Sequence, residues 1–409
     1  MTEIISWHPN QKDCLWIQET IWSVIQSFPV LRYLHVDAQF LQFTPTFKAF
    51  TTLESISISA LEASSLYTCL SKLYASCSTL TSIAISDKSG RRRFTKANSV
   101  DQIFLGCSKN VLPGCLRRLC LDDCFVHIDK FTLPHLRQLT SLELICLQHA
   151  WGGDHYLYGH PRDIWSSFVG SGIQLQELVH NTTTNSMIDY LSSYSGLKKL
   201  KLSASSFVDA SSSDEAATRF FNEVLSRHVE TLESLSLKAY YEGEWCFTSR
   251  NAGVISQCTK LNHLLMSIIS VETSRDSDSE EDDDEFDRNK VANPNVVSFC
   301  FQTEASLQHS STPHLQKHLL DTVVQLPLMT HLSLTAADPE YSRGSGCGTG
   351  RIRHCWTTLE EIRMNVTNYR PPPSCSYLPE VEVIGNEMFE GVRDAIGQLG
   401  YVVKLKKPN

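Results

Sequence analysis

The sequence predicts an α/β solenoid, in which a curved parallel β-sheet lines the concave side and helices cover the convex side. Three observations support this prediction. The spacing Leu-x-x-Leu-x-Leu, complete in residues 232–237, recurs in twelve recognisable copies. Segments with apolar residues at helical spacing separate the copies, and several of them end at Pro or Gly. A strand, a helix and another strand in succession favour parallel pairing and a right-handed coil.

Each copy fits one short strand. Leu235 and Leu237 are two positions apart, so both side chains point to one face of a strand, and Leu232 completes an apolar edge. Such an edge is hidden from water only if neighbouring copies cover it. The copies begin at Leu31, Leu53, Leu80, Leu116, Leu139, Leu175, Leu197, Leu232, Leu261, Val296, Met329 and Leu359. Their spacing ranges from 22 residues (Leu31 to Leu53) to 36 (Leu80 to Leu116), which is long and irregular for such repeats.

Helices are expected between the copies. Residues 15–28, 61–77 and, more briefly, 188–194 place apolar side chains along one helical face. The clearest case follows Ser212, which forms a plausible capping box with Glu215. After it comes an apolar stripe at helical spacing, made of Ala217, Phe220, Phe221, Val224 and Leu225.

The chain divides into one long solenoid and a cap. The solenoid spans residues 1–380. Residues 381–384 and 401–405 are typical of strands, and residues 387–399 of a helix that Asn386 begins. Residues 381–409 are therefore predicted to form a β-α-β cap that closes the open end of the same core.

An acidic insert interrupts the solenoid at residues 272–290. Between Glu272 and Asp287 the chain has ten acids and one base, a charge of −9. Self-repulsion and low apolarity predict a disordered loop. Ser277 and Ser279 each have an acidic residue three positions later, which makes them candidate phosphorylation sites.

The remaining charge excludes some classes of partner. The whole chain also has a net charge of −9, so residues outside the insert sum to about zero. No global basic field would attract nucleic acid or an anionic membrane. The fourteen cysteines are scattered, and the N-terminus does not resemble a signal peptide. We therefore expect a monomer in the cytoplasm, the nucleus or both.

The sequence has no recognisable catalytic or metal-binding motif. Neither G-x-S-x-G nor H-E-x-x-H occurs, and the Gly-rich residues 344–350 lack the Lys-Ser/Thr of a phosphate loop. Cys115, Cys120 and Cys124 have no second C-x-x-C pair. We expect no cofactor and no metal. The alternative is an enzyme whose residues converge from distant repeats, with His155 and His160 as first candidates.

The concave sheet face is the predicted binding surface. If Leu235 and Leu237 point inward, the alternate residues of each strand point outward. This register selects Tyr33, His35, Asp37, Lys199, Lys201, Ser234, Ser236, Lys238, His263, His331 and Arg363 as candidate partner-binding residues. Two aromatic loops that follow strands could add contacts at the rim. They contain Trp151, His155 and Tyr156 in one loop, and Tyr240, Tyr241 and Trp245 in the other.

The repeated spacing over residues 15–365 resembles the leucine-rich-repeat proteins. The long, irregular intervals, together with residues 225–241 and Gly346-Cys-Gly348, are similar to the repeats of fungal F-box proteins. The Asn or Cys that commonly follows the last Leu of such repeats is mostly missing here, with Cys124 and Asn181 near such positions.

This resemblance implies a substrate-receptor-like adaptor for ubiquitylation, which binds a protein through its concave face and rim loops. No F-box is visible in the chain. A Skp1-type adaptor is therefore expected only if a box lies upstream. The alternatives are a general scaffold and a phosphorylation-regulated nuclear interaction protein.

Overall fold

The fold is described from a computed structural model. The described residues are 4–10, 12–60, 64–87, 100–105, 115–122, 124, 128, 131–145, 162–204, 209–269, 312–337, 349–372, 379–384 and 400–404. The predicted acidic insert, the loop that contains Trp151, His155 and Tyr156, the phosphorylation candidates Ser277 and Ser279, and the predicted helix at 387–399 lie outside them.

In the described part of the chain, one open sheet of thirteen strands follows the order of the sequence. Twelve strands are parallel, and only β13 runs antiparallel to its neighbour β12. The strands are β1 (Ile4–Trp7), β2 (Tyr33–Asp37), β3 (Ser55–Ala60), β4 (Ser82–Asp87), β5 (Arg118–Asp122), β6 (Ser141–Ile145), β7 (Glu177–His180), β8 (Lys199–Ala204), β9 (Ser234–Ala239), β10 (His263–Ile268), β11 (His331–Ala336), β12 (Glu380–Ile384) and β13 (Gly400–Lys404).

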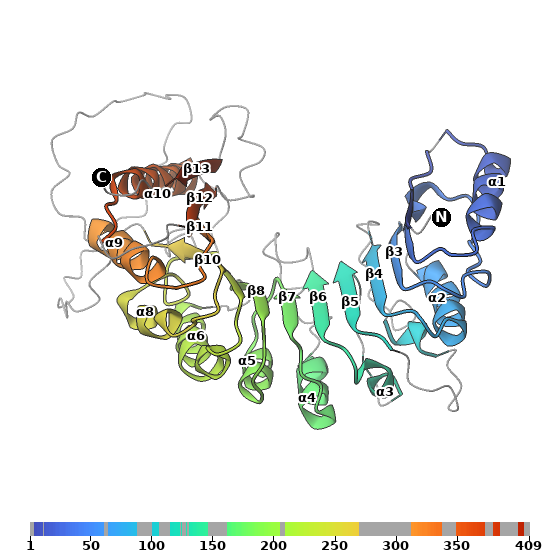
Figure 1. The fold of residues 1–409 in the computed structure, drawn as a ribbon, viewed down its shortest axis with the longest axis horizontal. Coiled ribbons are helices and arrows are strands. Elements are labelled where there is room, and N and C mark those ends of the chain that lie inside the picture. The colour runs from blue at the N-terminus through green and yellow to red at the C-terminus, as the bar shows by residue number, and fades with distance from the viewer. Residues whose placement is uncertain are drawn as a thin grey trace, which may run out of the picture.

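The helices lie along the outer side of an open arc, and the strands line its inner side (Figure 1). They are α1 (Leu15–Gln26), α2 (Ser64–Ser76), α3 (Leu133–Leu136), α4 (Arg162–Ser171), α5 (Asn185–Ser192), α6 (Ala210–Arg219), α7 (Ser226–His228), α8 (Ser249–Ser256), α9 (Thr312–Val323) and α10 (Thr349–Asn368). Three shorter segments are η1 (Ala38–Phe40), η3 (Val100–Ile103) and the π-helical η6 (Phe220–Leu225). The predicted α/β architecture with a parallel sheet is confirmed. Among the described helices, none has the length and apolar composition needed to cross a bilayer.

The core lies between the sheet and the helices. The second and fourth residues of neighbouring strands pair in register, as Leu200 does with Leu235 and Leu235 with Leu264. All three are at most 2% exposed. Burial of one such side chain contributes about 1.5–3 kcal/mol. Because each unit covers the apolar edge of the next, the Leu-x-x-Leu-x-Leu spacing accounts for this continuous core.

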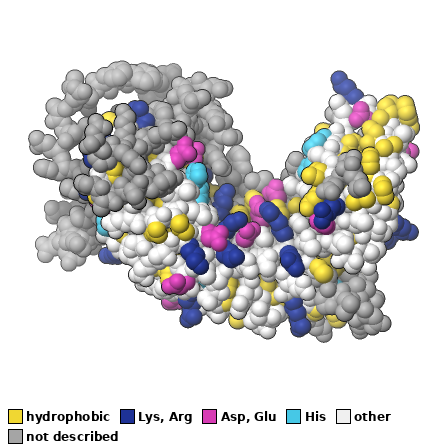
Figure 2. All heavy atoms as spheres, viewed as in Figure 1, with side chains coloured by type: hydrophobic (Ala, Val, Ile, Leu, Met, Phe, Trp, Pro, Cys, Tyr) yellow, Lys and Arg dark blue, Asp and Glu magenta, His cyan; other side chains and the backbone are white. Residues whose placement is uncertain are grey.

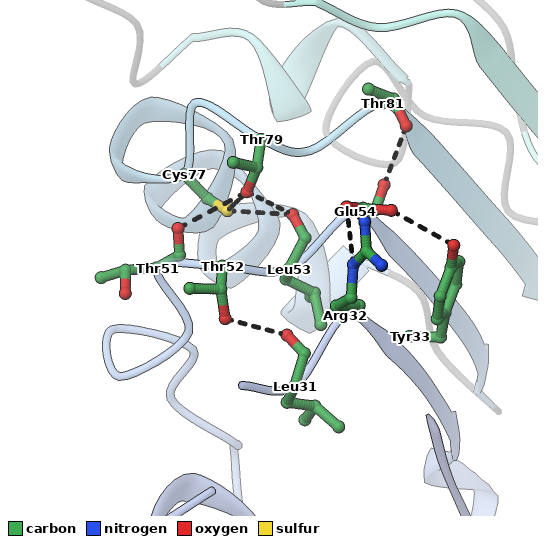
Figure 3. Close-up of polar contacts among 10 residues, drawn as sticks. All are labelled: Leu31, Arg32, Tyr33, Thr51, Thr52, Leu53, Glu54, Cys77, Thr79 and Thr81. Carbon is green, nitrogen blue, oxygen red and sulfur yellow. Dashed lines mark hydrogen bonds and ion pairs between the residues drawn. The ribbon is translucent and has the colours of Figure 1, made fainter. Parts of the chain in front are cut away.

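A repeated backbone contact joins the units at the entrance to each strand. The carbonyl oxygen of Glu54 accepts the N–H of Thr81 (2.8 Å) and of Ser82 (3.0 Å). The same double acceptance recurs at the carbonyls of Arg117 and Lys198. Threonine hydroxyls add to it, as Figure 3 shows where Thr79 Oγ1 donates to the Leu53 carbonyl at 2.8 Å. These bonds satisfy backbone groups that would otherwise be buried without partners.

Two of the twelve predicted strands do not coincide with a described strand. The copy at Leu359 is wrong, because residues 359–364 belong to helix α10. The apolar residues Leu359, Ile362 and Val366 are buried at helical spacing, which a period-two interpretation missed. The copy at Val296 lies outside the described residues, and β10 pairs directly with β11, so no strand stands between them.

Other boundaries also differ from the prediction. Strand β1 was not predicted, because its sequence Ile-Ile-Ser-Trp lacks the leucine spacing. Helix α6 begins three residues earlier than expected. Its N-cap is Asp209, whose carboxylate accepts the N–H of Ser212 at 2.8 Å, so the predicted Ser212–Glu215 capping box is wrong. The two predicted cap strands, at 381–384 and 401–405, are confirmed within one residue.

Candidate functional site

The concave face presents three rows of side chains across the strands, at the first, third and fifth strand positions. Register places corresponding residues side by side from strand to strand. Row one contains Tyr33, Ser55, Ser82, Arg118, Ser141, Glu177, Lys199, Ser234, His263, His331 and Glu380. Row two contains His35, Ser57, Ala84, Cys120, Glu143, Val179, Lys201, Ser236, Leu265, Ser333 and Glu382. Row three includes Asp37, Ser59, Ser86, Asp122, Ser203, Lys238, Ser267 and Thr335.

Ten of the predicted concave residues occupy these rows as expected from the register. Lys199 and Lys201 are exposed, and Ser234 and Lys238 are half-buried. Ser236 is only 7% exposed, because its short side chain stands between Lys201 and Leu265 in row two. A partner would therefore contact the larger neighbours of Ser236 before Ser236 itself.

The middle of the face is lined by ion pairs between neighbouring strands. The Lys199 ammonium lies 2.9 Å from the Glu177 carboxylate, and Arg118 lies 3.7 Å from Glu143. Ser141 donates a hydrogen bond to the second Glu177 oxygen at 3.1 Å. The hydrogen bond from Lys199, more than any other contact, lowers the pKa of Glu177 below its ordinary value. The Glu177 carboxylate therefore stays charged at neutral pH, and the middle of the face is strongly polar.

A polar cluster at the N-terminal end joins β1 and β2. The Nε2 atom of His8 lies 2.9 Å from the Ser6 hydroxyl, and its Nδ1 lies 3.8 Å from the Asp37 carboxylate. The His35 ring lies 5.1 Å from that of His8. The order of hydroxyl, imidazole and carboxylate is that of a hydrolytic triad, but the His8 side chain is 60% exposed and the carboxylate is beyond hydrogen-bond distance. We interpret this cluster as a polar surface.

A second histidine pair lies at the C-terminal end. The rings of His263 and His331 are 6.1 Å apart, and His331 Nε2 is 3.9 Å from the Glu380 carboxylate. Burial, with a smaller contribution from His331, lowers the pKa of His263, while Glu382 acts in the opposite direction. Histidines therefore stand at both ends of the concave face, as Figure 2 shows on either side of the hollow.

The loop after β9 folds back on the helical layer and does not form an exposed aromatic tip. Trp245 is 2% exposed and packs on Phe220 and Phe221 of the π-helical segment, with ring centroids 5.3 and 6.4 Å away. The prediction that Trp245 is a surface contact is wrong. Tyr240 and Tyr241 are half-buried at the start of this loop.

Asp214 of α6 holds this loop in place. Its carboxylate accepts the N–H of Glu244 at 3.0 Å. Gly243 has a φ of +157°, and a Cβ there would stand 2.7 Å from the Asp214 carboxylate. Only glycine permits this close approach. Sequence reasoning noticed the aromatic residues of the loop but could not identify the buried surface that receives them.

Arg363 does not lie on the sheet. It belongs to α10, because the Leu359 copy is helical. The pattern of apolar and charged residues in 359–364 is compatible with a strand and also with one face of a helix. Only the long continuation of the apolar pattern distinguishes the two.

The described cysteines and acids do not form a metal centre. No group of three or more His, Cys, Asp or Glu within the described ranges could hold an ion. Burial, assisted by Glu143, raises the pKa of the Cys120 thiol to about 12. Burial likewise raises the pKa of the Cys258 thiol to about 12. Thiols in such surroundings stay protonated at neutral pH and are poor nucleophiles and ligands.

Comparison with known proteins does not change this description. No protein-family model matches the chain, and a search of curated proteins finds no match. The concave face and its chemistry are therefore the basis for any functional assignment.

Proposed function

We propose that the chain is a non-catalytic protein-binding solenoid of the leucine-rich-repeat type, and that the concave face is its binding surface. The observation that supports this most is the three-row array of polar side chains across neighbouring strands. Their backbones are fixed by inter-strand hydrogen bonds and by the buried leucines on the opposite face. A rigid, broad and polar surface suits the recognition of another protein with little ordering cost.

The composition of the face also favours protein binding over catalysis. Its most exposed charges stand in rows on strands and do not converge on one point. Its ion pairs between strands are partly exposed, so partner groups could exchange with them. Val179 and Leu265 lie half-buried in row two and would add apolar contact area to the charged contacts.

The test is a matched pair of substitutions. Val179→Arg places a long charged side chain in the middle of the concave face, whereas Val169→Arg makes the same change on the outer helix α4, where Val169 is 47% exposed. Partners captured from source cells by the intact chain should be lost with V179R and retained with V169R. Equal capture by both variants would contradict a concave binding surface.

The more specific version of the proposal is a substrate receptor of the F-box type, and it rests on the sequence resemblance alone. Its test is the co-purification of Skp1-type and cullin subunits, with the present chain and with one extended upstream. If neither subunit co-purifies with either chain, the ligase version fails and a general scaffold remains.

A further inference from the structure

Positive charge gathers over the middle repeats of this otherwise acidic chain. We define the basic band as the cationic residues on the concave face of β5–β10 and in the turns that lead into these strands. It contains Arg117, Arg118, Arg137, Lys198, Lys199, Lys201, Lys238 and Lys260. Figure 2 shows Lys and Arg side chains over the middle of the arc, with fewer Asp and Glu among them.

The carboxylates of the same surface do not balance the basic band. They are Asp122, Glu143, Glu177, Glu230 and Glu233. Eight cations and five carboxylates leave a local charge of +3, in a chain whose total is −9. The opposite edge of the sheet differs, because the described residues that follow β8 and β9 include Asp209, Asp214, Glu242 and Glu244. Among the described residues, this end of β8 and β9 is therefore the more acidic one, with Glu244 paired to Arg250 at 3.1 Å.

Internal ion pairs use only part of the basic band. Lys199 is paired with Glu177, and Arg118 with Glu143. Arg117, Lys198 and Lys201 are exposed and form no ion pair with another described residue. Lys201 is the most central of these, since Val179 and Ser236 are its neighbours in row two. Its charge is therefore available to a partner.

Helix dipoles account for only some of these cations. The helices run opposite to the parallel strands, so their C-termini lie near the turns that lead into the strands, where cations are favourable. This explains residues such as Arg137, which is the C-cap residue of α3. It does not explain Arg118, Lys199, Lys201 or Lys238, which lie on strands.

We infer that the basic band binds an acidic segment of the protein partner. This inference rests on the proposed concave binding function and adds the chemistry of the ligand. The separated cations, with carboxylates between them, match a peptide whose own carboxylates are spaced along the chain. A nucleic acid fits less well, because Glu143 and Glu177 would repel its regularly spaced phosphates. The described outward residues of β5–β9 also include no aromatic ring on which a base could stack.

The probe is a fluorescein-labelled peptide of about twelve residues that alternates Glu and Ser, with a Gln/Ser peptide of the same length for comparison. Fluorescence anisotropy at about 50 mM NaCl keeps screening low. The intact chain should bind the Glu peptide and not the Gln peptide. Because the whole chain is acidic, general electrostatic attraction cannot produce this binding.

Two double variants with equal charge change locate the contact. K198E/K201E should weaken binding of the Glu peptide by about tenfold, since each reversal replaces an attraction by a repulsion. K48E/K72E reverses two exposed lysines away from the basic band and should change binding by less than about twofold. Equal effects of the two variants, or no binding of the Glu peptide, would overturn the inference. Tighter binding of a single-stranded oligonucleotide of equal charge, with the same dependence on K198E/K201E, would also overturn it.

The partner experiments separate this inference from the proposed function. If V179R abolishes capture of the partner while K198E/K201E captures it normally, the concave surface is correct and the acidic ligand is wrong. If both variants capture the partner like the intact chain, the proposed function itself fails. Loss of capture with both variants, but not with K48E/K72E, supports both.

Discussion

Strands β3–β4 and strands β8–β9 bury the same kind of core and present different chemistry to the concave side. In β3–β4 the inward residues are isoleucines at most 1% exposed, and in β8–β9 they are leucines at most 2% exposed. The outward residues of β3–β4 are five serines and an alanine, whereas those of β8–β9 include three lysines. Register is the same in both pairs. The comparison teaches that the inward positions determine the solenoid and leave the chemistry of the outward positions free to vary.

The largest effect is expected from the core, and it should be equal in the two regions. Ile56→Ala and Leu235→Ala each remove a side chain that is 0% exposed. Each should lower the free energy of unfolding by about 3 kcal/mol, because the cavity adds to the lost transfer energy. Guanidinium unfolding monitored by circular dichroism measures both. A cost below about 1 kcal/mol at either site would show that the two cores are not equivalent.

The turns before the strands should respond differently to acid. Before β4, Cys77 and Thr79 donate to the Leu53 carbonyl at 3.2 and 2.8 Å. Before β9, Thr231 makes the same kind of contact, donating to the Leu197 carbonyl at 2.8 Å. His228, which is 1% exposed, adds two further contacts there. Its Nδ1 accepts the Leu197 N–H at 3.3 Å, and its Nε2 lies 3.1 Å from the Leu191 carbonyl. A proton on Nδ1 would oppose the Leu197 N–H.

Acid should therefore destabilise the fold through His228. Burial lowers the pKa of His228 below its ordinary value, so below pH 6.5 the unfolded chain takes a proton that the folded chain refuses. Stability is full above that pH and falls as the pH drops toward the folded pKa, by at most about 1.4 kcal/mol per pH unit for one proton. Thermal unfolding between pH 7.5 and 5.5 should show a shallower dependence in H228Q. Buried His135 also has a lowered pKa and keeps some dependence in the variant.

The outward positions should have small effects on stability in both regions. Lys199→Ala removes the ion pair with Glu177. Both side chains are partly exposed, so the substitution should lower the free energy of unfolding by only about 0.5 kcal/mol. Ser55→Ala, at the matching position of β3, should change stability by less than that. High salt should abolish the cost of K199A and leave S55A unchanged. A large effect of either variant would mean that the outward rows also hold the fold together.

Most of the sheet could be predicted from the sequence, because ten of the twelve copies coincide with described strands. The leucine spacing predicts these strands because the leucines occupy the positions that are buried on one face of the sheet. The two ends of the solenoid were harder to predict from the sequence. Strand β1 has no leucine repeat, and its Trp7 is buried through stacking on Trp22 at 5.8 Å, a contact between distant residues. The copy at Leu359 failed because one short apolar pattern fits two periods.

The positions of the concave side chains could be predicted from the sequence, but their surroundings could not. Alternation placed Lys199 and Lys201 on the concave face. It could not show that Glu177 pairs with Lys199 and Glu143 with Arg118, while Lys201 forms no ion pair with another described residue. That distinction depends on register between strands far apart in the sequence. The burial of Trp245 likewise depends on the π-helical segment that receives its ring, for which the sequence offers no signal.

The smallest effect on stability is expected from deletion of the acidic insert. This deletion tests whether strands β8–β11, like β3–β4, are stable without an inserted segment. Strands β10 and β11 pair over six residues although residues 272–290 come between them in sequence. Deletion of residues 272–290 shortens the connection by less than half, so loop-closure entropy changes by about 0.5 kcal/mol at most. The melting temperature should therefore stay within about 2 °C of that of the intact chain. A fall of more than about 5 °C would mean that the stability of the repeats around β10 and β11 depends on the insert, unlike that of β3–β4.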